Sequence, residues 1–460
     1  MKVPTTSSRA HPERVTPFDM SNLRVEEHGM PMHVTAVVLL DGAPLMDSGG
    51  ELLLADIRRH VECRTSDTAR LRQVLVWPRR GRPTWVHDPA FDIDSHVVTR
   101  RVPEPGDEQS LLDLCCELDR PPLDRSRPLW QLWLLTGLAD GRVALLVRLH
   151  HVIADGIAAL ELLSSVLDVA PDVEAAMTTG PPVTTSASNT PTPARLRYAT
   201  ARPRRLVAAA APLALRARQV WAFARLGRAP RVSWLRPVGG TRTLALIRAD
   251  LVAAKKAAHA HGGKLNDVVL AAVGGGAHRL LRSRGELVPG LAIHVAVAAS
   301  VRRPGESGGN RVGIRLVPVP VDEPDAGARL EAVATYTAAA RSLPPYHPNN
   351  RLLQRWMVRI MSRQRTINLV LSNMPGPTVP LYFAGARVQE MFQLSALQGN
   401  VGIGVGVLSY AGALNVDIVA DPEIVPDIGI FVDGVCEAFV GLGVMRDRGA
   451  AQAQRGGGRA

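Results

Sequence analysis

Short β-prone apolar runs alternate with Ala- and Leu-rich amphipathic stretches along the first 175 residues. The runs 33–40, 73–77 and 143–149 predict strands, and the stretches 52–62 and 109–118 predict helices. Strands and helices that alternate along a chain are typical of an α/β or α+β domain. The first part of the chain is therefore expected to form one such unit.

A second series of the same kind begins near residue 241. A strand is predicted at 243–247, followed by helices at 251–261 and from 266 to about 281. Further apolar runs predict strands at 292–298, 312–319, 367–371, 401–408 and 413–419. No short repeat is present, which argues against a solenoid.

Low-complexity composition separates the two series. Residues 178–194 consist almost entirely of Pro, Thr, Ser, Ala and Gly, which is typical of a linker. We therefore expect a first half at 1–175, a linker with a basic amphipathic helix at 176–240, a second half at 241–445, and a disordered tail at 446–460.

The positive charge lies in the middle of the chain. The net charge is +12, and residues 175–249 contain thirteen arginines and no acidic residue, so this stretch carries the whole excess. It has no lysine and no nucleic-acid-binding motif, so no nucleic-acid partner is expected. Arginines around Trp221 and Phe223 predict either an interfacial helix on anionic lipid, spanning 195–231, or a solvated linker helix, and both interpretations stay open.

Cysteine usage and hydropathy bear on location. Four cysteines occur, two of them adjacent at Cys115 and Cys116, a pattern that fits a reduced cytosolic protein better than a disulfide framework. The first residues contain no apolar run like that of a signal peptide, and the apolar stretch 401–413 is too short to span a bilayer. We expect a cytoplasmic protein, peripheral on the inner face of the membrane or on lipid droplets if 195–231 binds lipid.

Two histidines and a carboxylate lie in one turn at the end of the strand 143–149. His150, His151, Asp155 and Gly156 precede a predicted helix. An imidazole has an ordinary pKa of about 6.5 and can take up and return a proton at neutral pH. Neighbouring strand residues point to opposite faces, so the two histidines are not expected to share a metal ion. The turn is therefore a candidate proton-handling site. Asp155 is expected to orient the ring or, more simply, to cap the helix with Gly156.

Further motifs accompany this turn in a fixed order. They are Phe18-Asp19, Pro31-Met32-His33, the block 82–97, and the segment 122–130, which ends in Pro128-Leu129-Trp130. With His150 to Gly156 as an HHxxxDG motif, this order resembles the bacterial wax ester synthase/diacylglycerol acyltransferase family. The resemblance covers nearly the whole chain.

The second half continues the resemblance. Asn266-Asp267 is similar to the family's ND motif, and 295–304 to its arginine-bearing strand and turn. The segment 371–377 is similar to SNVPGP with Met374 in place of Val, and 409–427 resembles the C-terminal strand and turn. The stretch 228–243 departs from the family pattern. The positions expected to bind substrate are Pro128, Leu129, Trp130, Asn266, Asp267, Ser372, Asn373, Pro375 and Gly376.

Each of these motifs also has a simpler structural interpretation. Pro128 to Trp130 can pack in the interior. Asn266-Asp267 can cap a helix, and Pro375 to Pro377 can form a turn. The residues alone do not decide between these roles and substrate contact.

The resemblance implies an α/β fold of two chloramphenicol-acetyltransferase-like halves around a central tunnel, as in condensation domains. It implies O-acyl transfer from acyl-CoA, a substrate and not a cofactor, to diacylglycerol or a long-chain alcohol. His151 would be the general base, with no acyl-enzyme, metal or cofactor, and Asn266 or Asn373 a candidate oxyanion donor. Two alternatives remain: a lipid-binding or lipid-droplet paralogue with weak catalysis, and acyl transfer to a glycolipid or polyketide hydroxyl.

Overall fold

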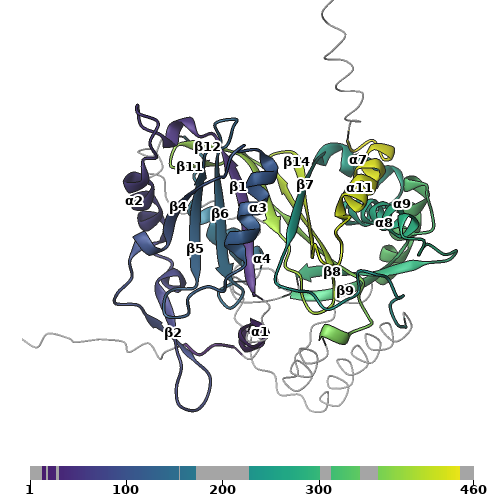
Figure 1. Ribbon diagram of the computed structural model, residues 1–460, viewed down its shortest axis with the longest axis horizontal. Coiled ribbons are helices and arrows are strands. Elements are labelled where there is room, and N and C mark those ends of the chain that lie inside the picture. Colours follow the sequence, from purple (N-terminus) through teal and green to yellow (C-terminus); the bar gives the residue numbers. More distant parts are fainter. Residues whose placement is uncertain are drawn as a thin grey trace, which may run out of the picture.

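Two six-stranded sheets stand next to each other in the computed structural model, each with its own helices (Figure 1). The structure describes residues 13–16, 19–26, 31–154, 156–171, 227–300, 312–341 and 361–445. The predicted fold class, a mixed α/β protein of two sheet-rich halves, is confirmed.

The first sheet has the strand order β11-β12-β1-β6-β5-β4. All neighbouring strands run antiparallel except β4 and β5, which are parallel. Its strands are β1 (His33–Leu40), β4 (Val97–Arg101), β5 (Trp130–Thr136), β6 (Val143–His150), β11 (Tyr382–Phe383) and β12 (Ala386–Leu394).

The strand that leads to the histidine pair is central and covered on both faces. Every residue of β6 is buried, as expected for an apolar run with helices or loops on each side of the sheet. β6 pairs with β1 so that His150 lies opposite His33. The register therefore brings a third histidine beside the motif, from 117 positions earlier in the chain.

The second sheet has the order β7-β14-β13-β10-β8-β9, in which β10 is parallel to both β8 and β13. Its strands are β7 (Thr243–Asp250), β8 (Ala292–Ser300), β9 (Val312–Pro320), β10 (Leu369–Pro375), β13 (Ile403–Tyr410) and β14 (Ala413–Ala420). A separate hairpin is formed by β2 (Gln73–Val76) and β3 (Thr84–His87).

Helices cover the sheets (Figure 1), and hydrophobic residues of the helices and strands form the buried cores. Asp107, Asp250 and Asp325 each accept a hydrogen bond from a backbone N–H at a helix start, where such groups lack helical partners. The helices of the first half are α1 (Asp19–Glu26), α2 (Leu54–Thr65), α3 (Glu108–Asp119) and α4 (Gly156–Ser165), and those of the second are α7 (Leu251–Ala260), α8 (Leu265–Ser283), α9 (Ala326–Ala340) and α11 (Ile428–Gly441). Short 3-10 turns occupy 43–45, 69–72, 93–95 and 361–363.

α8 and α11 cross at very short range. A side chain added at Gly275 would lie 2.8 Å from the Cβ of Ala438 and 2.9 Å from the carbonyl oxygen of Gly434. Glycine inside a helix costs about 1 kcal/mol relative to alanine. Here it permits a contact between helix backbones that no larger residue allows.

The structure adds elements that the hydropathy pattern did not predict. β12 lies within the range expected for the second half but is hydrogen-bonded into the first sheet beside β1. The end of the expected linker, from residue 227, packs on the second half, where Trp234 is fully buried and its indole N–H donates to the carbonyl of Asn368 at 2.9 Å. In the described parts of the chain, no helix is long and apolar enough to cross a membrane.

Candidate active site

The turn after β6 is held in place by backbone hydrogen bonds to two neighbouring segments. The amide of His150 donates to the carbonyl of Leu129 at 3.0 Å, and the amide of His151 donates to the carbonyl of Met32 at 2.8 Å. The amide of Ile153 closes the turn by donating to the carbonyl of His150 at 2.8 Å. His151 is half-buried at this turn, whereas His150 is fully buried.

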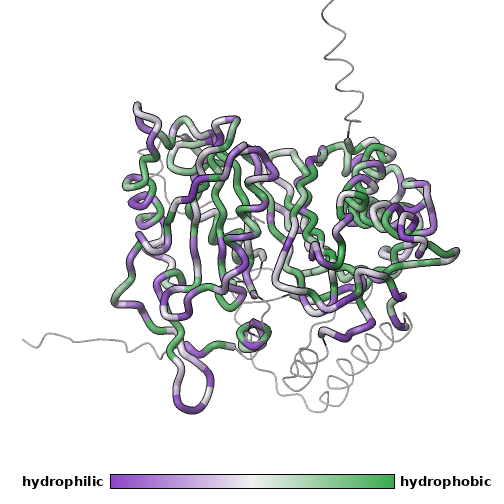
Figure 2. Tube along the Cα trace, viewed as in Figure 1, coloured by the Kyte–Doolittle hydropathy of each residue, from purple (hydrophilic) through white to green (hydrophobic). Residues whose placement is uncertain are grey.

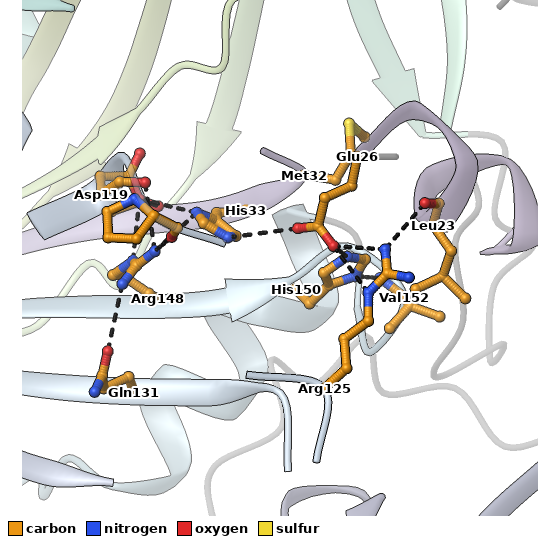
Figure 3. A network of polar contacts seen from close by, with 12 residues as sticks. Leu23, Glu26, Met32, His33, Asp119, Arg125, Gln131, Arg148, His150 and Val152 are labelled. Carbon is orange, nitrogen blue, oxygen red and sulfur yellow. Dashed lines mark hydrogen bonds and ion pairs between the residues drawn. The ribbon is translucent and has the colours of Figure 1, made fainter. Parts of the chain in front are cut away.

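The side chain of His150 is held by a hydrogen bond at Nδ1 and faces a carboxylate at Nε2. Its Nδ1 accepts a hydrogen bond from the backbone N–H of Val152 at 2.9 Å, so the ring proton belongs on Nε2. Nε2 lies 3.4 Å from Oε2 of Glu26 (Figure 3). Burial lowers the pKa of His150, against the opposing effect of Glu26, so the ring is neutral at pH 7. His150 thus helps to fix the position of the turn that carries His151.

Glu26, the last residue of α1, is the buried anion of this cluster. Nη2 of Arg125 donates to its Oε2 at 2.7 Å and to the carbonyl of Leu23 at 3.1 Å. Burial alone raises the pKa of the Glu26 carboxyl, but the contacts with His150 and Arg125 outweigh it and hold this pKa at about 2. The carboxylate therefore stays ionised at every physiological pH.

The cluster continues along the sheet to α3 (Figure 3). Nε2 of His33 lies 3.8 Å from Oε1 of Glu26, and its Nδ1 lies 3.3 Å from Oδ1 of Asp119. Arg148 donates from Nε to the same Asp119 oxygen at 3.3 Å. Burial raises the pKa of Asp119, but His33, Arg148 and Thr35 together bring it below its ordinary value. A continuous series of ionisable side chains thus runs from the turn after β6 into the first half.

The second half reaches this turn at Gly156. A side chain on Gly156 would lie 2.5 Å from the sulfur of Met374, so Met374 would have to shift to admit one. Met374 occupies the position at which the sequence differs from the SNVPGP pattern. The HHxxxDG turn of one half and the β10 motif of the other are therefore in direct contact.

Asn373 and Asn266 are also brought together. Nδ2 of Asn373 donates a hydrogen bond to Oδ1 of Asn266, which joins the end of β10 to the start of α8. Asp267 has a different environment: it accepts from the amide of Lys264 at 2.7 Å and from the hydroxyl of Thr337 at 2.8 Å. Asp267 thus caps α8, while Asn266 and Asn373 form one amide pair near Met374.

The Pro128-Leu129-Trp130 segment lies under the turn, inside the first half. All three residues are buried. The indole N–H of Trp130 donates to the carbonyl of Leu71 at 2.8 Å, and its ring stacks on His96 at a centroid distance of 4.5 Å. The segment contacts the turn after β6 through the Leu129 carbonyl.

The remaining predicted positions follow along β10 and its turn. The carbonyl of Ser372 accepts a hydrogen bond from Nε2 of Gln393 at 2.6 Å, and Pro375 is exposed. A side chain on Gly376 would lie 2.1 Å from the carbonyl oxygen of Ser409, so this glycine permits the close approach of the turn to β13. Asp155, most of 195–231 and the arginine-bearing turn at 301–304 lie outside the described residues.

A cavity of about 50 Å³ lies where the two sheets approach each other. His33 and Cys116 line it from the first half, and Arg242 and Leu244 from the second. Burial, with the nearby Asp119 and Asp113 carboxylates, raises the pKa of Cys116 to about 12. The thiol is therefore protonated at neutral pH and is a poor nucleophile.

Sequence reasoning missed most of the buried cluster. It included His33 and Arg125 only as parts of motifs, and it assigned nothing to Glu26, Asp119 or Arg148. The available signal was a polar residue inside an otherwise apolar strand, as at Arg148, because a buried charge requires a partner. The partners come from three separate segments, which hydropathy cannot connect.

Two family models match the chain. The wax ester synthase/diacylglycerol acyltransferase catalytic domain matches residues 15–269, and the WS/DGAT C-terminal domain matches residues 308–442. A Mycobacterium tuberculosis protein provisionally named a diacylglycerol O-acyltransferase is 30% identical over 470 residues, covering 95% of this chain and 91% of that protein. A probable diacylglycerol O-acyltransferase of the same species is 29% identical, covering 96% and 98%.

Solved structures agree with the fold. A wax ester synthase/diacylglycerol acyltransferase from Marinobacter aquaeolei has a TM-score of 0.68 at 22% identity, covering 94% of this chain and 98% of that one. The starter condensation domain of rhizomide synthetase, in complex with C8-CoA, has a TM-score of 0.62 at 16% identity, covering 94% and 95%. With both family models matched, the chain belongs to the wax ester synthase/diacylglycerol acyltransferase family.

Proposed function

We propose that this acyltransferase moves a fatty acyl group from acyl-CoA to the hydroxyl of diacylglycerol or of a long-chain alcohol, with His151 as the general base. The observation that carries the proposal is the position of His151. It lies half-buried on a rigid turn, at the point where motifs of the two halves touch through Gly156 and Met374.

The proposed reaction needs one imidazole and no covalent intermediate on the protein. His151 takes the proton of the acceptor hydroxyl as its oxygen attacks the thioester carbonyl carbon. The new C–O bond forms, the C–S bond breaks, and the imidazolium returns the proton to the departing CoA thiolate. Holding both substrates between the halves lowers the entropic cost of a reaction between two molecules.

The cysteines near the cavity support direct transfer. Burial raises the pKa of Cys115 far above its ordinary value and that of Cys116 to about 12. A protonated, buried thiol is a poor acceptor for an acyl group. We therefore expect no acyl-enzyme on either side chain.

The paired amides of Asn266 and Asn373 are the candidates for stabilising the oxyanion. Because Asn373 donates to Asn266, removing either amide also disturbs the other. An oxyanion donor is worth about 3 kcal/mol. If the two act as one unit, the losses in kcat of Asn266→Ala and Asn373→Ala should be less than additive in the double variant.

We also propose that the protein works at a lipid surface as a peripheral protein. Diacylglycerol and long-chain alcohols dissolve in membranes or lipid droplets rather than in water. The arginine-rich stretch 195–231 is the part of the sequence first expected to bind anionic lipid. If this stretch binds anionic lipid, its deletion or the reversal of its charge should weaken binding of the protein to anionic vesicles.

The decisive experiment for turnover is a thiol-release assay with acyl-CoA and, in turn, diacylglycerol, monoacylglycerol and a long-chain alcohol. His151→Ala should lower the rate by a factor on the order of 10²–10⁴. His259→Ala, which removes an exposed histidine at the end of α7, is the matched control and should leave the rate unchanged. Full turnover by His151→Ala would contradict the proposal, as would the absence of CoA release that depends on an added acceptor.

A further inference from the structure

The β2–β3 hairpin projects from the first half, away from both sheets (Figure 1). Leu75 pairs with Trp85, and Val74 pairs with Val86. Successive residues of a strand point to opposite faces, so these two pairs lie on opposite faces of the hairpin. Leu75 and Trp85 are buried against the first half. The other face is turned outward.

The hairpin exposes several apolar side chains. Val76 and Val86 lie on the outward face, and Trp77 follows directly after the end of β2. Val76 and Trp77 are each 46% exposed, and Val86 is 40% exposed. These three are among the few large apolar side chains that the described residues expose to this degree, and here they gather on one small hairpin. A cluster of this kind on a projecting element marks an interaction site.

The tip of the hairpin carries positive charge. Residues 78–81 are exposed and include Arg79 and Arg80. The loop at the tip is hydrophilic along the chain trace (Figure 2). Arg82, at the base of the tip, donates to the carbonyl of Val15 at 2.8 Å and anchors it. The sequence from 73 to 87 contains three arginines and no acidic residue. The surface therefore combines tryptophan, valine and arginine, which suits the interface of an anionic lipid layer, where tryptophan lies at headgroup level and arginine contacts phosphate.

The hairpin is attached directly to the active-site side of the molecule. Just before β2, the carbonyl of Leu71 accepts the hydrogen bond of the Trp130 indole, and the neighbouring Leu129 carbonyl accepts from His150. The hairpin and α1, which carries Glu26, lie toward the same end of the first half (Figure 1). A surface bound by the hairpin would thus face the end of the sheet at which the catalytic turn opens.

We infer that the β2–β3 hairpin docks the protein on an anionic lipid surface, with Val76, Trp77 and Val86 in the headgroup region and Arg79 and Arg80 on lipid phosphates. The biological purpose rests on the proposed function, because a lipid-dissolved acceptor must be taken from that surface. The docking itself is independent of turnover. It also requires no contribution from the basic stretch 195–231.

Vesicle flotation tests the inference with the full chain. The vesicles contain either phosphatidylcholine alone or phosphatidylcholine with about one third phosphatidylglycerol. The variants are Val76→Ser with Trp77→Ser, and Arg79→Ser with Arg80→Ser. Val252→Ser with Val288→Ser is the matched control, because these valines are 70% and 53% exposed in the second half. Circular dichroism and thermal unfolding establish that each variant is folded.

Both hairpin variants should bind the anionic vesicles on the order of tenfold more weakly, and the control should bind like the unmodified chain. The arginine variant should lose most of the preference for anionic over neutral vesicles. Unchanged flotation of folded hairpin variants would overturn the inference, as would a change in oligomeric state without a change in vesicle binding. The hairpin variants should transfer acyl groups to a short, water-soluble alcohol at the rate of the unmodified chain. If the proposed function is wrong, the unmodified chain itself should show no such turnover.

Discussion

The two halves meet at the same turn, but the side chains that surround it differ in kind: those of the first half are charged or polar, and those of the second are mainly apolar. Below His151, the first half buries a chain of charged and polar side chains that runs from Arg125 and Glu26 through His33 to Asp119 and Arg148 (Figure 3). The second half reaches this turn through Met374, which packs into the hydrophobic cluster of the first half. Its own aliphatic core is larger, and Asn266 and Asn373 pair with each other at the end of β10. The first half thus supports the turn that carries His151 with charged and polar side chains, and the second half contacts it through apolar packing.

This difference has a physical reason. A base needs a fixed tautomer and a fixed position, and in a protein interior only hydrogen bonds and ion pairs provide these directions. A surface that only has to keep its shape needs no such groups. Apolar packing provides that shape without the desolvation cost of buried ion pairs. We therefore expect substitutions in the first half to act through charge, and those in the second half to act through volume.

The largest effect is expected at Glu26. Glu26→Ala leaves the guanidinium of Arg125 and the ring of His150 without their buried carboxylate, and removing one partner of a buried pair typically costs about 3–5 kcal/mol. Chemical denaturation should show this loss, and kcat should fall at least tenfold because the turn below His151 loosens. Glu13→Ala is the control: Glu13 contacts Arg70 at 2.7 Å but its side chain is 68% exposed, so the loss should stay below about 1 kcal/mol. Equal losses in the two variants would contradict the assignment.

A buried carboxyl in the second half should respond to pH in the opposite direction. Asp417, on β14, accepts a hydrogen bond from the amide of Ser395 at 2.9 Å, and burial raises its pKa from 3.8 to about 7. A raised pKa adds stability below pH 4 that is lost as the pH rises toward 7. The loss is about 4 kcal/mol if the whole shift is realised. The lowered pKa of Glu26 adds stability above pH 4.5 that is lost as the pH falls toward 2.

Asp417→Asn isolates this effect. Measured by denaturation at several pH values, its stability relative to the unmodified chain should increase from pH 4 to pH 7 and stay level above that. A constant difference across this range would show that Asp417 is ionised in the folded protein.

The helix crossing of the second half should be sensitive to volume alone. Gly275→Ala places a methyl group 2.8 Å from the Cβ of Ala438, and overpacking of this kind costs about 1–3 kcal/mol. Gly429→Ala, in α11, meets nothing within 4 Å and should be neutral or slightly stabilising. The rate per folded molecule should be unchanged in both variants. A Gly275→Ala protein that is folded but inactive would show that this crossing acts on the site directly.

The smallest effect is expected where the halves touch. Met374→Val shortens the side chain that packs on Gly156 and restores the residue typical of the family at this position. Exchanges between apolar residues of similar size usually cost less than about 1.5 kcal/mol. The acceptor preference, measured by thiol release with alcohols of increasing length, is the sensitive readout. An unchanged preference would show that Met374 supports the turn without contacting substrate.

Hydropathy and local chemistry were sufficient for much of the fold. The predicted strand 33–40 coincides with β1, and the strands at 143–149 and 413–419 each end within one residue of β6 and β14. These strands are predictable because their signal, a short apolar β-prone run, is local. The histidine pair at the end of β6 was predictable for the same reason.

Tertiary structure alone decided which distant residues share an environment. β12 joins the first sheet although it follows most of the second, and Glu26 reaches His150 from a helix near the start of the chain. Asn373 meets Asn266 across 107 positions. Local signals predict what each segment becomes. Pairing across a hundred residues depends on the packing of the whole chain. That packing places Glu26 beside His150 and Met374 against Gly156.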